Sequence, residues 1–474
     1  MTDTKTAVAP AEPVLEAIPA HVWRVAGVVV FGAVMSMLDT SLVNIGLNTI
    51  ATDLGATLDS SQWVASAYLL ALAVTLPLVG WLGRRFGMGR IWLTALVGFT
   101  VTSGLCALAP NIEWLIALRI AQGLSAGLLV PAGQALIGQV AGPRGLGRVM
   151  SVVGIAVVSA PAFGPTLGGV MLAHLDWQWL FLINIPLGLV AFVLAVRLLP
   201  LGKGARADAR FDVTGFVLIG AGLSLLVYGL GEYGSRGAFS APTVWVSVLV
   251  GAVALGGFVL RSARGRGALL DMTMFRSPVF VTANIANTFS GASLYGAMLL
   301  LPLYFQLLHH QGLIATGLSL LTFGIGGILV LPIAGRVTDR YGGGVIAVVG
   351  NALNVLVTVP FAFGDAATNA VLVQVLLLIR GMATALTGMP VVSAAYASVR
   401  REQLPDAASM VNILQRVGGS VGAALLAVVL YRATTAGLAL DAGFRQAFWW
   451  LTGATSISLI GSIFLWRAES RRIP

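Results

Sequence analysis

The sequence predicts an all-α polytopic membrane protein with about fourteen transmembrane helices. Of its 474 residues, 57% are hydrophobic and only 10% are charged, whereas a soluble domain carries roughly a quarter charged residues. The apolar residues fall into blocks of about twenty, the length that a helix needs to cross a hydrocarbon layer of roughly 30 Å. The blocks are apolar around their whole circumference, unlike the one-sided stripe of a soluble helix.

The predicted spans follow one another with short polar connections. Alternate connections hold most of the basic residues, about 22 of the 28 Lys and Arg lying on one side, which places both termini in the cytoplasm. No apolar core with a small-residue cleavage site follows the polar first twenty residues, so we expect no removable signal peptide and a multi-pass protein of the inner membrane. The spans cover residues 24–48, 61–82, 91–109, 113–138, 147–173, 179–199, 213–233, 242–261, 279–306, 314–335, 345–364, 369–398, 406–431 and 444–466.

Several classes of function are disfavoured. The net charge of +10 is explained by the basic loops, so no nucleic-acid partner is expected. The single cysteine, Cys106, permits no intrachain disulfide. The sequence has no Walker loop, no metal-ligand spacing among its histidines and no nucleophile motif. We therefore expect no enzyme, no catalytic residue, no cofactor and no metal site.

Two pairs of similar segments indicate an internal repeat. Residues 80–87 and 335–342 are Gly/Arg-rich loops 255 residues apart, and Arg119 and Arg380 are 261 residues apart. This offset equals eight spans, so two six-helix units are expected on either side of two extra helices, although chance similarity of such loops is the alternative. The predicted divisions are a cytoplasmic tail 1–20, a first bundle 21–200, two extra helices with linkers 201–277, a second bundle 278–466 and a tail 467–474.

The first span carries a polar stripe and a carboxylate. Ser36, Thr40, Asn44 and Asn48 recur every four residues, and Asp39 lies beside them. Such groups cannot face lipid, so the stripe must face the bundle or a wet cavity. Intramembrane acids usually mark ion or substrate pathways. Asp39 is expected to bind a proton or a cationic substrate; the alternative is that it locks helix packing through a buried hydrogen bond.

An arginine within the fourth span needs a partner. Arg119 precedes a run of small residues that begins at Gly123 and lets another helix approach closely. Asp39 is the expected partner, and the alternative is a structural pair or an arginine that extends to the interface. Arg380 and Arg416 are weaker candidates, for which a structural role is favoured.

The fifth span contains helix-disrupting residues. Two prolines and three glycines favour a kinked helix packed tightly on a neighbour. Glu232, near the outer end of the seventh span, is either a second titratable site or a solvent-exposed cap. The hinge residues are Pro161, Gly164, Pro165, Gly168 and Gly169.

Charged residues in the two repeated loops are candidates for a conformational latch. Asp339 and Arg340 lie where the tenth span meets the cytoplasm, and Arg84 and Arg85 lie in the first copy. Such groups can hold neighbouring helix ends through their dipoles and release them as the bundles rock. The alternative is a solvated cytoplasmic turn.

Taken in order, these motifs resemble the major facilitator superfamily, specifically its fourteen-helix drug:proton antiporter branch of EmrB/QacA-like proteins. The resemblance covers nearly the whole chain. Three positions depart from the pattern: Ala160 stands where glycine is usual, Gln178 where arginine is usual, and Arg84 where the loop motif normally carries aspartate. The matching residues are Leu38, Asp39, Val43 and Asn44; Gln62 and Trp63; residues 67–70; Arg119, Gln122 and Gly123; Gly164, Pro165, Gly168 and Gly169; residues 177–186; Leu270 and Asp271 with Phe275 and Arg276; and residues 412–419.

The resemblance implies a major facilitator fold, with two six-helix bundles, two extra linker helices and a central cavity. It implies alternating-access export of amphipathic, often cationic drugs or dyes against inward proton flow, with Asp39 and Arg119 coupling the two. A dedicated exporter of one endogenous metabolite or lipid is the alternative, and a non-transporting scaffold or sensor is a second. The partners are small-molecule substrates, protons and membrane lipids; a periplasmic adaptor stays open, and a monomer is expected. The cavity candidates are Ser36, Thr40, Asn44, Tyr68, Gln122, Tyr304, Gln306, Asn412 and Arg416.

Overall fold

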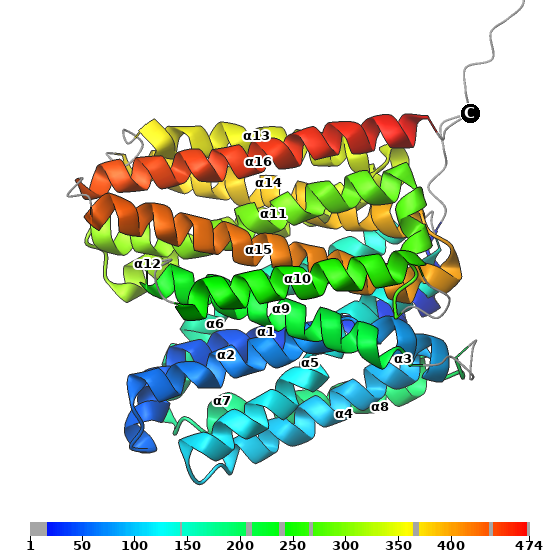
Figure 1. Cartoon of the computed structure of the whole chain (residues 1–474), viewed down its shortest axis with the longest axis horizontal. Helices are drawn as coiled ribbons and strands as arrows, with labels where there is room; N and C mark the ends of the chain where they lie inside the picture. The colour runs from blue at the N-terminus through cyan, green and yellow to red at the C-terminus, as the bar shows by residue number, and fades with distance from the viewer. Residues whose placement is uncertain are drawn as a thin grey trace, which may run out of the picture.

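The computed structural model is a bundle of long helices that run roughly alongside one another (Figure 1). It describes residues 17–142, 145–204, 211–236, 242–264, 269–363, 369–435 and 439–471. Within these ranges the regular elements are helices and no β-strand is present. The all-α prediction is confirmed for the part of the chain that the structure describes.

The described residues of the first half of the chain form eight helices. Helices α2 and α4 pack on α5, and α1 packs between α5 and α6. The predicted span 61–82 is two helices bent by 55°, because Pro77 at the junction has no N–H to continue the hydrogen-bond ladder. The helices are α1 (Ala20–Asp53), α2 (Leu58–Thr75), α3 (Leu78–Phe86), α4 (Met88–Ala107), α5 (Ile112–Ala141), α6 (Leu146–His174), α7 (Trp179–Leu182) and α8 (Asn184–Leu198).

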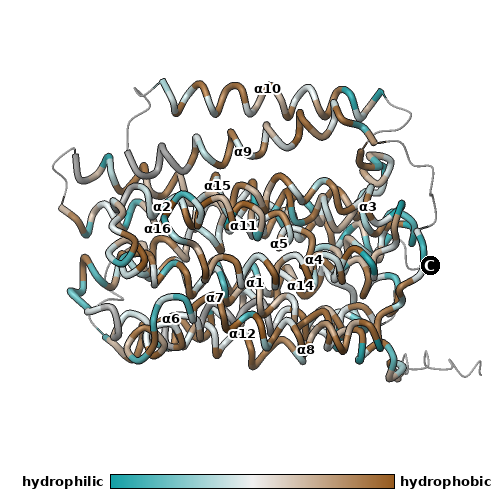
Figure 2. Tube along the Cα trace, turned by 90° about the horizontal axis from the view of Figure 1, so that it is seen from below, coloured by the Kyte–Doolittle hydropathy of each residue, from teal (hydrophilic) through white to brown (hydrophobic). Residues whose placement is uncertain are grey.

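Two further helices, α9 (Val213–Arg236) and α10 (Pro242–Arg264), form an outer layer. Helix α10 packs on α9, and α9 packs on α2 and α15; Figure 2 shows the pair covering one side of the bundle. Asp212 joins their ends by accepting hydrogen bonds from the Arg261 Nε and Nη2 atoms at 3.1 and 2.9 Å. Burial raises the pKa of the Asp212 carboxyl, but the hydrogen bonds from Arg261 and Gly215 outweigh burial and lower it below its usual value.

The second half of the chain repeats the packing of the first. Helix α11 packs on α15 and α16, and α13 packs on α14 and α16. Helix α12 packs on α14 and also on α6 of the first half. The elements are α11 (Pro278–Leu303), a π-helical turn (Tyr304–Leu308), α12 (Leu313–Tyr341), α13 (Gly343–Phe363), α14 (Ala370–Ala397), α15 (Leu404–Thr435) and α16 (Leu440–Ser470), with short 3₁₀ turns at Met272–Arg276 and Arg401–Gln403.

Twelve helices in the described residues are long and apolar enough to cross a membrane, or up to thirteen if the bent pair α2–α3 is one span. The predicted count of fourteen is not confirmed. The remaining predicted span, 147–173, corresponds to α6, a helix of 29 residues, part of whose side chains lie outside the described set. A multi-pass membrane protein is confirmed.

Both ends of the described chain lie at the same end of the bundle, which we call the termini end. The start of the chain lies beside the start of α6, where a Cβ on Gly145 would be 3.2 Å from Ile18. Near the end of α16, Glu469 accepts a 2.6 Å hydrogen bond from the Gly344 amide at the start of α13. The repeated Gly/Arg motifs were predicted as loops but are helical, because each continues the preceding apolar helix up to a glycine C-cap: residues 80–86 lie in α3 and residues 335–341 end α12.

Candidate functional site

A buried ion pair joins α1 and α5. The Arg119 Nη1 atom donates a hydrogen bond of 2.6 Å to Asp39 Oδ2. The two side chains are 1% and 0% exposed, so the pair is shielded from bulk solvent. Charges buried in this way are costly unless each is paired and fully hydrogen-bonded. The structure therefore brings together the two residues that the sequence singled out for coupling.

Two amides complete the shell of the carboxylate. Asp39 Oδ1 accepts hydrogen bonds from Gln122 Nε2 at 2.9 Å and from Asn184 Nδ2 at 3.1 Å. Gln122 also accepts from Arg119 Nη1 at 2.8 Å, and Asn184 donates to Ser103 at 3.0 Å. Both carboxylate oxygens are thus held by donors from two other helices, α5 and α8, which converge on α1.

The guanidinium is also sandwiched by aromatic and backbone groups. Its central carbon lies 4.0 Å from the Tyr68 ring centroid and 5.8 Å from that of Phe181. Arg119 Nε donates to the Val64 carbonyl at 3.1 Å. The Tyr68 hydroxyl lies 3.3 Å from the Ser36 hydroxyl, so Tyr68 and Ser36 extend the same cluster. Stacking on an aromatic face is favourable for a desolvated cation.

Small residues let these helices approach closely. A Cβ on Gly123 would lie 2.4 Å from the Tyr68 carbonyl oxygen, so α5 touches the backbone of α2 directly. On the other side of α1, a Cβ on Gly164 would lie 2.1 Å from the Ser41 hydroxyl. Gly168 likewise faces Leu42, whereas Gly169 has open space. Helix α6 is one continuous helix through this segment; the side chains of Pro161 and Pro165 lie outside the described set.

The polar stripe of α1 changes its surroundings along the helix. Ser36 is buried, Thr40 is half-buried and hydrogen-bonds the Ser36 carbonyl at 3.0 Å, and Asn44 is exposed. The exposure of the stripe therefore increases away from the termini end.

The remaining cavity candidates lie apart from the ion pair. Tyr304 is buried among Phe361, Phe444, Phe448 and His309, with ring centroids 4.8 to 5.8 Å away. Gln306 and Arg416 are half-buried. Glu232 lies on α9, and its side chain is outside the described set.

Asn412 has a different position, at the junction of the two halves. Its Nδ2 atom donates to Gln134 Oε1 on α5 at 2.8 Å, and Gln134 also accepts from the Tyr396 hydroxyl at 3.0 Å. Gln134 and Tyr396 were not among the sequence candidates, because a glutamine and a tyrosine within apolar spans give no distinctive signal. This buried polar group ties α5 to α14 and α15.

The second half buries an arginine that has no matching acid. Arg380 on α14 is 2% exposed, and its Nη1 donates to the Thr358 hydroxyl. Its Nε has no hydrogen-bond partner, and among the described residues Arg380 forms no ion pair. Arg119 and Arg380 thus occupy corresponding places in the repeat with different partners.

Two ion pairs join the halves at the termini end. Arg84, in the last turn of α3, pairs with Asp406 in the first turn of α15 and donates to the Leu269 carbonyl at 2.9 Å. Asp339, at the end of α12, accepts from Arg148 Nε at 2.7 Å and from the Gly147 amide at 2.8 Å at the start of α6. Arg84 therefore joins the two halves through an ion pair, although the motif normally carries aspartate at this place; we call the two cross-half ion pairs the latches.

The two latches correspond through the repeat, with their charges exchanged. Asp339 follows Arg84 by 255 residues, and Asp406 follows Arg148 by 258. In both latches a carboxylate lies at the N-terminus of a helix, where the helix dipole favours negative charge. In one latch the end of α12 supplies that carboxylate to the start of α6. In the other, the first turn of α15 carries it and the end of α3 supplies the arginine. Asp406 was missed because it begins a predicted span and its partner lies 322 residues away.

The other two charged candidates of the repeated motifs, Arg85 and Arg340, are exposed. Arg85 lies over the rings of Trp81 and Phe86, each centroid 5.5 Å away. Arg340 lies over Tyr341 at 5.2 Å. The cross-half ion pairs described above involve Arg84 and Asp339.

Long apolar helices around a buried charge network are typical of membrane transporters, and comparisons with known proteins support that class. A family model described as "Major Facilitator Superfamily" matches residues 29–423. The chain is 37% identical over 410 residues to the "Multidrug resistance protein B homolog" of Mycobacterium tuberculosis, covering 86% of this chain and 76% of that protein. It is 28% identical over 408 residues to the "Multidrug export protein EmrB" of Haemophilus influenzae, covering 84% and 78%.

Among solved structures, the human organic anion transporter MFSD10 has a similar fold. The TM-score is 0.64 at 17% identity, with 94% of this chain and 100% of the other covered. At this identity the likeness concerns the fold. The chain belongs to the major facilitator superfamily. It is a transporter rather than an enzyme, and its relatives include multidrug resistance proteins.

Proposed function

We propose that this protein is a proton-coupled antiporter that exports amphipathic, often cationic drugs or dyes across the inner membrane by alternating access. The observation that carries the proposal is the buried network in which Asp39 is held by Arg119, Gln122 and Asn184. The names of the multidrug resistance relatives support the substrate class.

The network supports coupling because Asp39 can exchange partners. As an anion, Asp39 is held by three donors, Arg119, Gln122 and Asn184, so a proton or a cation must displace at least one of them. When Asp39 is neutralised, Arg119 loses its counter-charge, and a buried cation without a partner is costly. Protonation therefore favours a rearrangement of α1 against α5, which is the step that an exchanger needs.

The contacts between the halves support alternating access. The ion pairs Arg84–Asp406 and Arg148–Asp339 and the Gln134 cluster lie toward the termini end. They hold this end closed. Breaking them would let the halves separate here, while the increasing exposure of the α1 stripe marks the opposite end as the open one.

We further propose fourteen spans with both termini cytoplasmic, and the same divisions as the sequence predicts: a tail 1–20, bundles 21–200 and 278–466, two extra helices in 201–277 and a tail 467–474. The pairing of α9 with α10 outside the bundle supports this division. We expect a monomer. A periplasmic adaptor is an open question that co-purification from the native membrane would answer.

The test is ethidium efflux in proteoliposomes with an imposed proton gradient. Wild-type protein should transport ethidium only when the gradient is present. Asp39→Asn keeps the size of the side chain but cannot exchange a proton, so transport should fall to the level of empty liposomes. The matched control is Asp53→Asn, which removes an acid from the end of the same helix.

The outcome also separates the alternatives. Full gradient-dependent transport by folded Asp39→Asn protein would refute the coupling role. If folded wild-type protein moves none of a broad panel of dyes and drugs, a dedicated exporter of one metabolite or lipid becomes the better explanation.

A further inference from the structure

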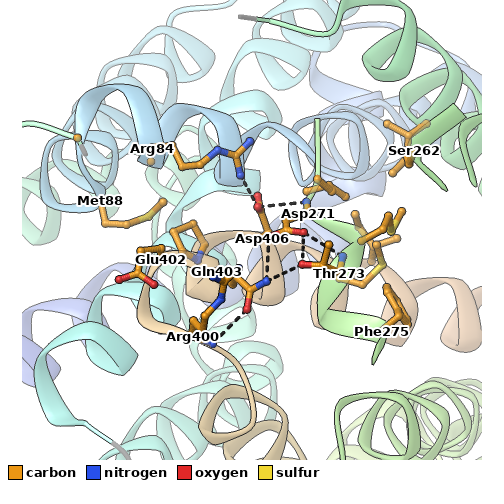
Figure 3. A pocket seen from close by; sticks show the side chains of 18 of the residues that line it. Arg84, Met88, Ser262, Asp271, Thr273, Phe275, Arg400, Glu402, Gln403 and Asp406 are labelled. Carbon is orange, nitrogen blue, oxygen red and sulfur yellow. Dashed lines mark hydrogen bonds and ion pairs between the residues drawn. The ribbon is translucent and has the colours of Figure 1, made fainter. Parts of the chain in front are cut away.

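A large cavity lies at the termini end, apart from the Asp39 network. Its volume is about 1870 Å³, larger than the roughly 300–1,000 Å³ of pockets for drug-sized ligands. It opens between the α9–α10 pair, the segment 269–277, the start of α4 and the first half of α15 (Figure 3). Because α9 covers the boundary between α2 and α15, the cavity lies where the two halves and the outer pair meet.

The walls of the cavity are mostly apolar. Side chains from α9, α10 and α15 line it. A ligand that fills this space must therefore carry a long apolar part. The apolar lining includes Leu223, Leu255, Phe258, Phe275, Ile413 and Leu414.

The rim carries basic side chains with free charge. Lys203, Arg264 and Arg276 line the cavity and are exposed, and among the described residues none of them forms an ion pair. The acids in the lining are in part already engaged. Asp406 pairs with Arg84, and Asp271 accepts from Thr273 and from Gln403 at 2.8 Å.

Asp271 keeps its negative charge. Burial raises the pKa of its carboxyl, but the hydrogen bonds from Thr273 and Gln403 outweigh burial and hold the pKa below its usual value. The lining nevertheless has a positive net charge, which suits an external anion, because five basic residues face three acidic ones: Arg84, Lys203, Arg264, Arg276 and Arg400 against Asp271, Glu402 and Asp406. Glu402, also in the lining, is exposed to solvent.

A buried polar atom inside the cavity has no partner. Ser262 on α10 is 6% exposed and lines the cavity (Figure 3), yet its hydroxyl has no hydrogen-bond partner. A buried hydroxyl without a partner costs about 1–3 kcal/mol. A rotation of the side chain that turns this hydroxyl into the cavity would let a polar group of a ligand satisfy it.

We propose that this cavity binds an anionic phospholipid from the membrane leaflet at the termini end. The phosphate lies among Lys203, Arg264 and Arg276, a polar group of the lipid backbone reaches Ser262, and the acyl chains lie along the apolar walls. Basic pockets between transmembrane helices bind anionic lipid headgroups in this way. The lipid would fill the space beneath the Arg84–Asp406 latch and join the α9–α10 pair to α15.

The test measures lipid binding to the delipidated full-length protein in detergent by native mass spectrometry. Dioleoyl phosphatidylglycerol should bind about tenfold or more tightly than dioleoyl phosphatidylcholine, because three basic groups each attract the anionic headgroup. The combined variant Lys203→Gln, Arg264→Gln and Arg276→Gln should bind both lipids equally. The matched control, Arg197→Gln, Arg336→Gln and Arg467→Gln, removes three exposed basic residues outside the cavity and should keep the preference.

Three results would overturn the proposal. Equal binding of the two lipids to wild-type protein would show that the site does not recognise the anionic headgroup. Equal loss in the control variant would assign the preference to general surface charge. Displacement of phosphatidylglycerol by soluble glycerol phosphate would identify a site for free phosphate. Thermal unfolding of each variant in detergent checks that it is folded, and Ser262→Phe, which fills the cavity without changing charge, should weaken binding of both lipids.

Discussion

The two halves of the molecule bury an arginine at corresponding places but surround it differently. Arg119 has a carboxylate, two amides and two aromatic rings around its site, whereas Arg380 has the hydroxyl of Thr358. The packing around the two arginines is alike, since Gly123 and Gly381 each bring their helix against the backbone of a neighbour. The repeat thus preserves helix packing and the arginine, while the acid is found in the first half.

This difference separates a structural requirement from a chemical one. A framework built from two similar halves needs similar close contacts, and these are present in both. Proton exchange needs a single titratable group whose neutralisation changes a balance of charge. The network of Asp39 can supply that change, and the surroundings of Arg380 cannot.

The largest expected effect distinguishes the two arginines directly. Arg119→Leu leaves a buried carboxylate without its counter-charge, which should cost about 3–5 kcal/mol of folding free energy. Arg380→Leu removes a buried cation that has no ion-pair partner among the described residues, so its cost should be near zero, and a gain is consistent with the same reasoning. Unfolding in mixed SDS micelles measures both. Equal destabilisation by the two variants would show that Arg380 has a counter-charge of its own.

The second prediction concerns the exchanged charges of the two latches. Arg84→Asp places a second carboxylate beside Asp406 at the start of α15. It should destabilise the closed termini end by about 2–3 kcal/mol, because a charged hydrogen bond is lost and the two carboxylates repel each other. Adding Asp406→Arg restores an ion pair and should recover most of the loss. The recovery should be incomplete, since the helix N-terminus then carries a cation.

The distance between labels on the two sides of the termini end, measured by electron spin resonance, reports closure in each variant. The corresponding exchange, Asp339→Arg with Arg148→Asp, is the matched control, because it places the carboxylate on the helix as α15 already does. If the Arg84→Asp protein closes as fully as wild type, the ion pair with Asp406 does not hold this end.

The sequence was informative about residues whose burial in a membrane span is energetically costly. Asp39 and Arg119 stand out because charges within apolar spans are rare, and their pairing follows from their need for partners. Asn184 also contacts Asp39 but was missed, because an amide near the start of a span is inexpensive and common. The pairing of Arg84 with Asp406 depends on how two distant parts of the chain meet, and no local pattern encodes that.

The helices also divide into features that a local pattern in the sequence predicts and features that it does not. The predicted span 242–261 is observed as Pro242–Arg264, and 345–364 as Gly343–Phe363, because an apolar run of fixed length determines where a membrane helix lies. The bend at Pro77 was not predicted. Proline is tolerated in membrane helices, so its presence alone does not distinguish a bend from a continuous helix.

A smaller effect should follow from removing the missed amide. Asn184→Leu deletes one donor to Asp39, and a hydrogen bond to a charged group is worth about 1.5–3 kcal/mol. Because Asp39 Oδ1 then keeps Gln122 as its amide donor, the variant should lose about this much free energy of unfolding in mixed SDS micelles, and ethidium efflux should fall only in part. Ser103→Ala, which removes the neighbour that orients Asn184, should have a smaller effect in the same direction. Unchanged efflux in both variants would limit Asn184 to packing.

The smallest expected effect tests the close helix packing at glycines, which the two halves share. A Cβ on Gly164 of α6 would lie 2.1 Å from the Ser41 hydroxyl, and one on Gly422 of α15 would lie 2.5 Å from the Ala292 carbonyl. Gly164→Ala and Gly422→Ala should each cost about 1–3 kcal/mol through overpacking, with Gly422 the larger, because a backbone carbonyl cannot rotate away as a serine side chain can. Gly169→Ala, which meets open space, is the control and should be neutral or slightly stabilising. If the two glycine variants lose similar free energies of unfolding while the two arginine variants respond unequally, the halves differ in their buried charge and not in their packing.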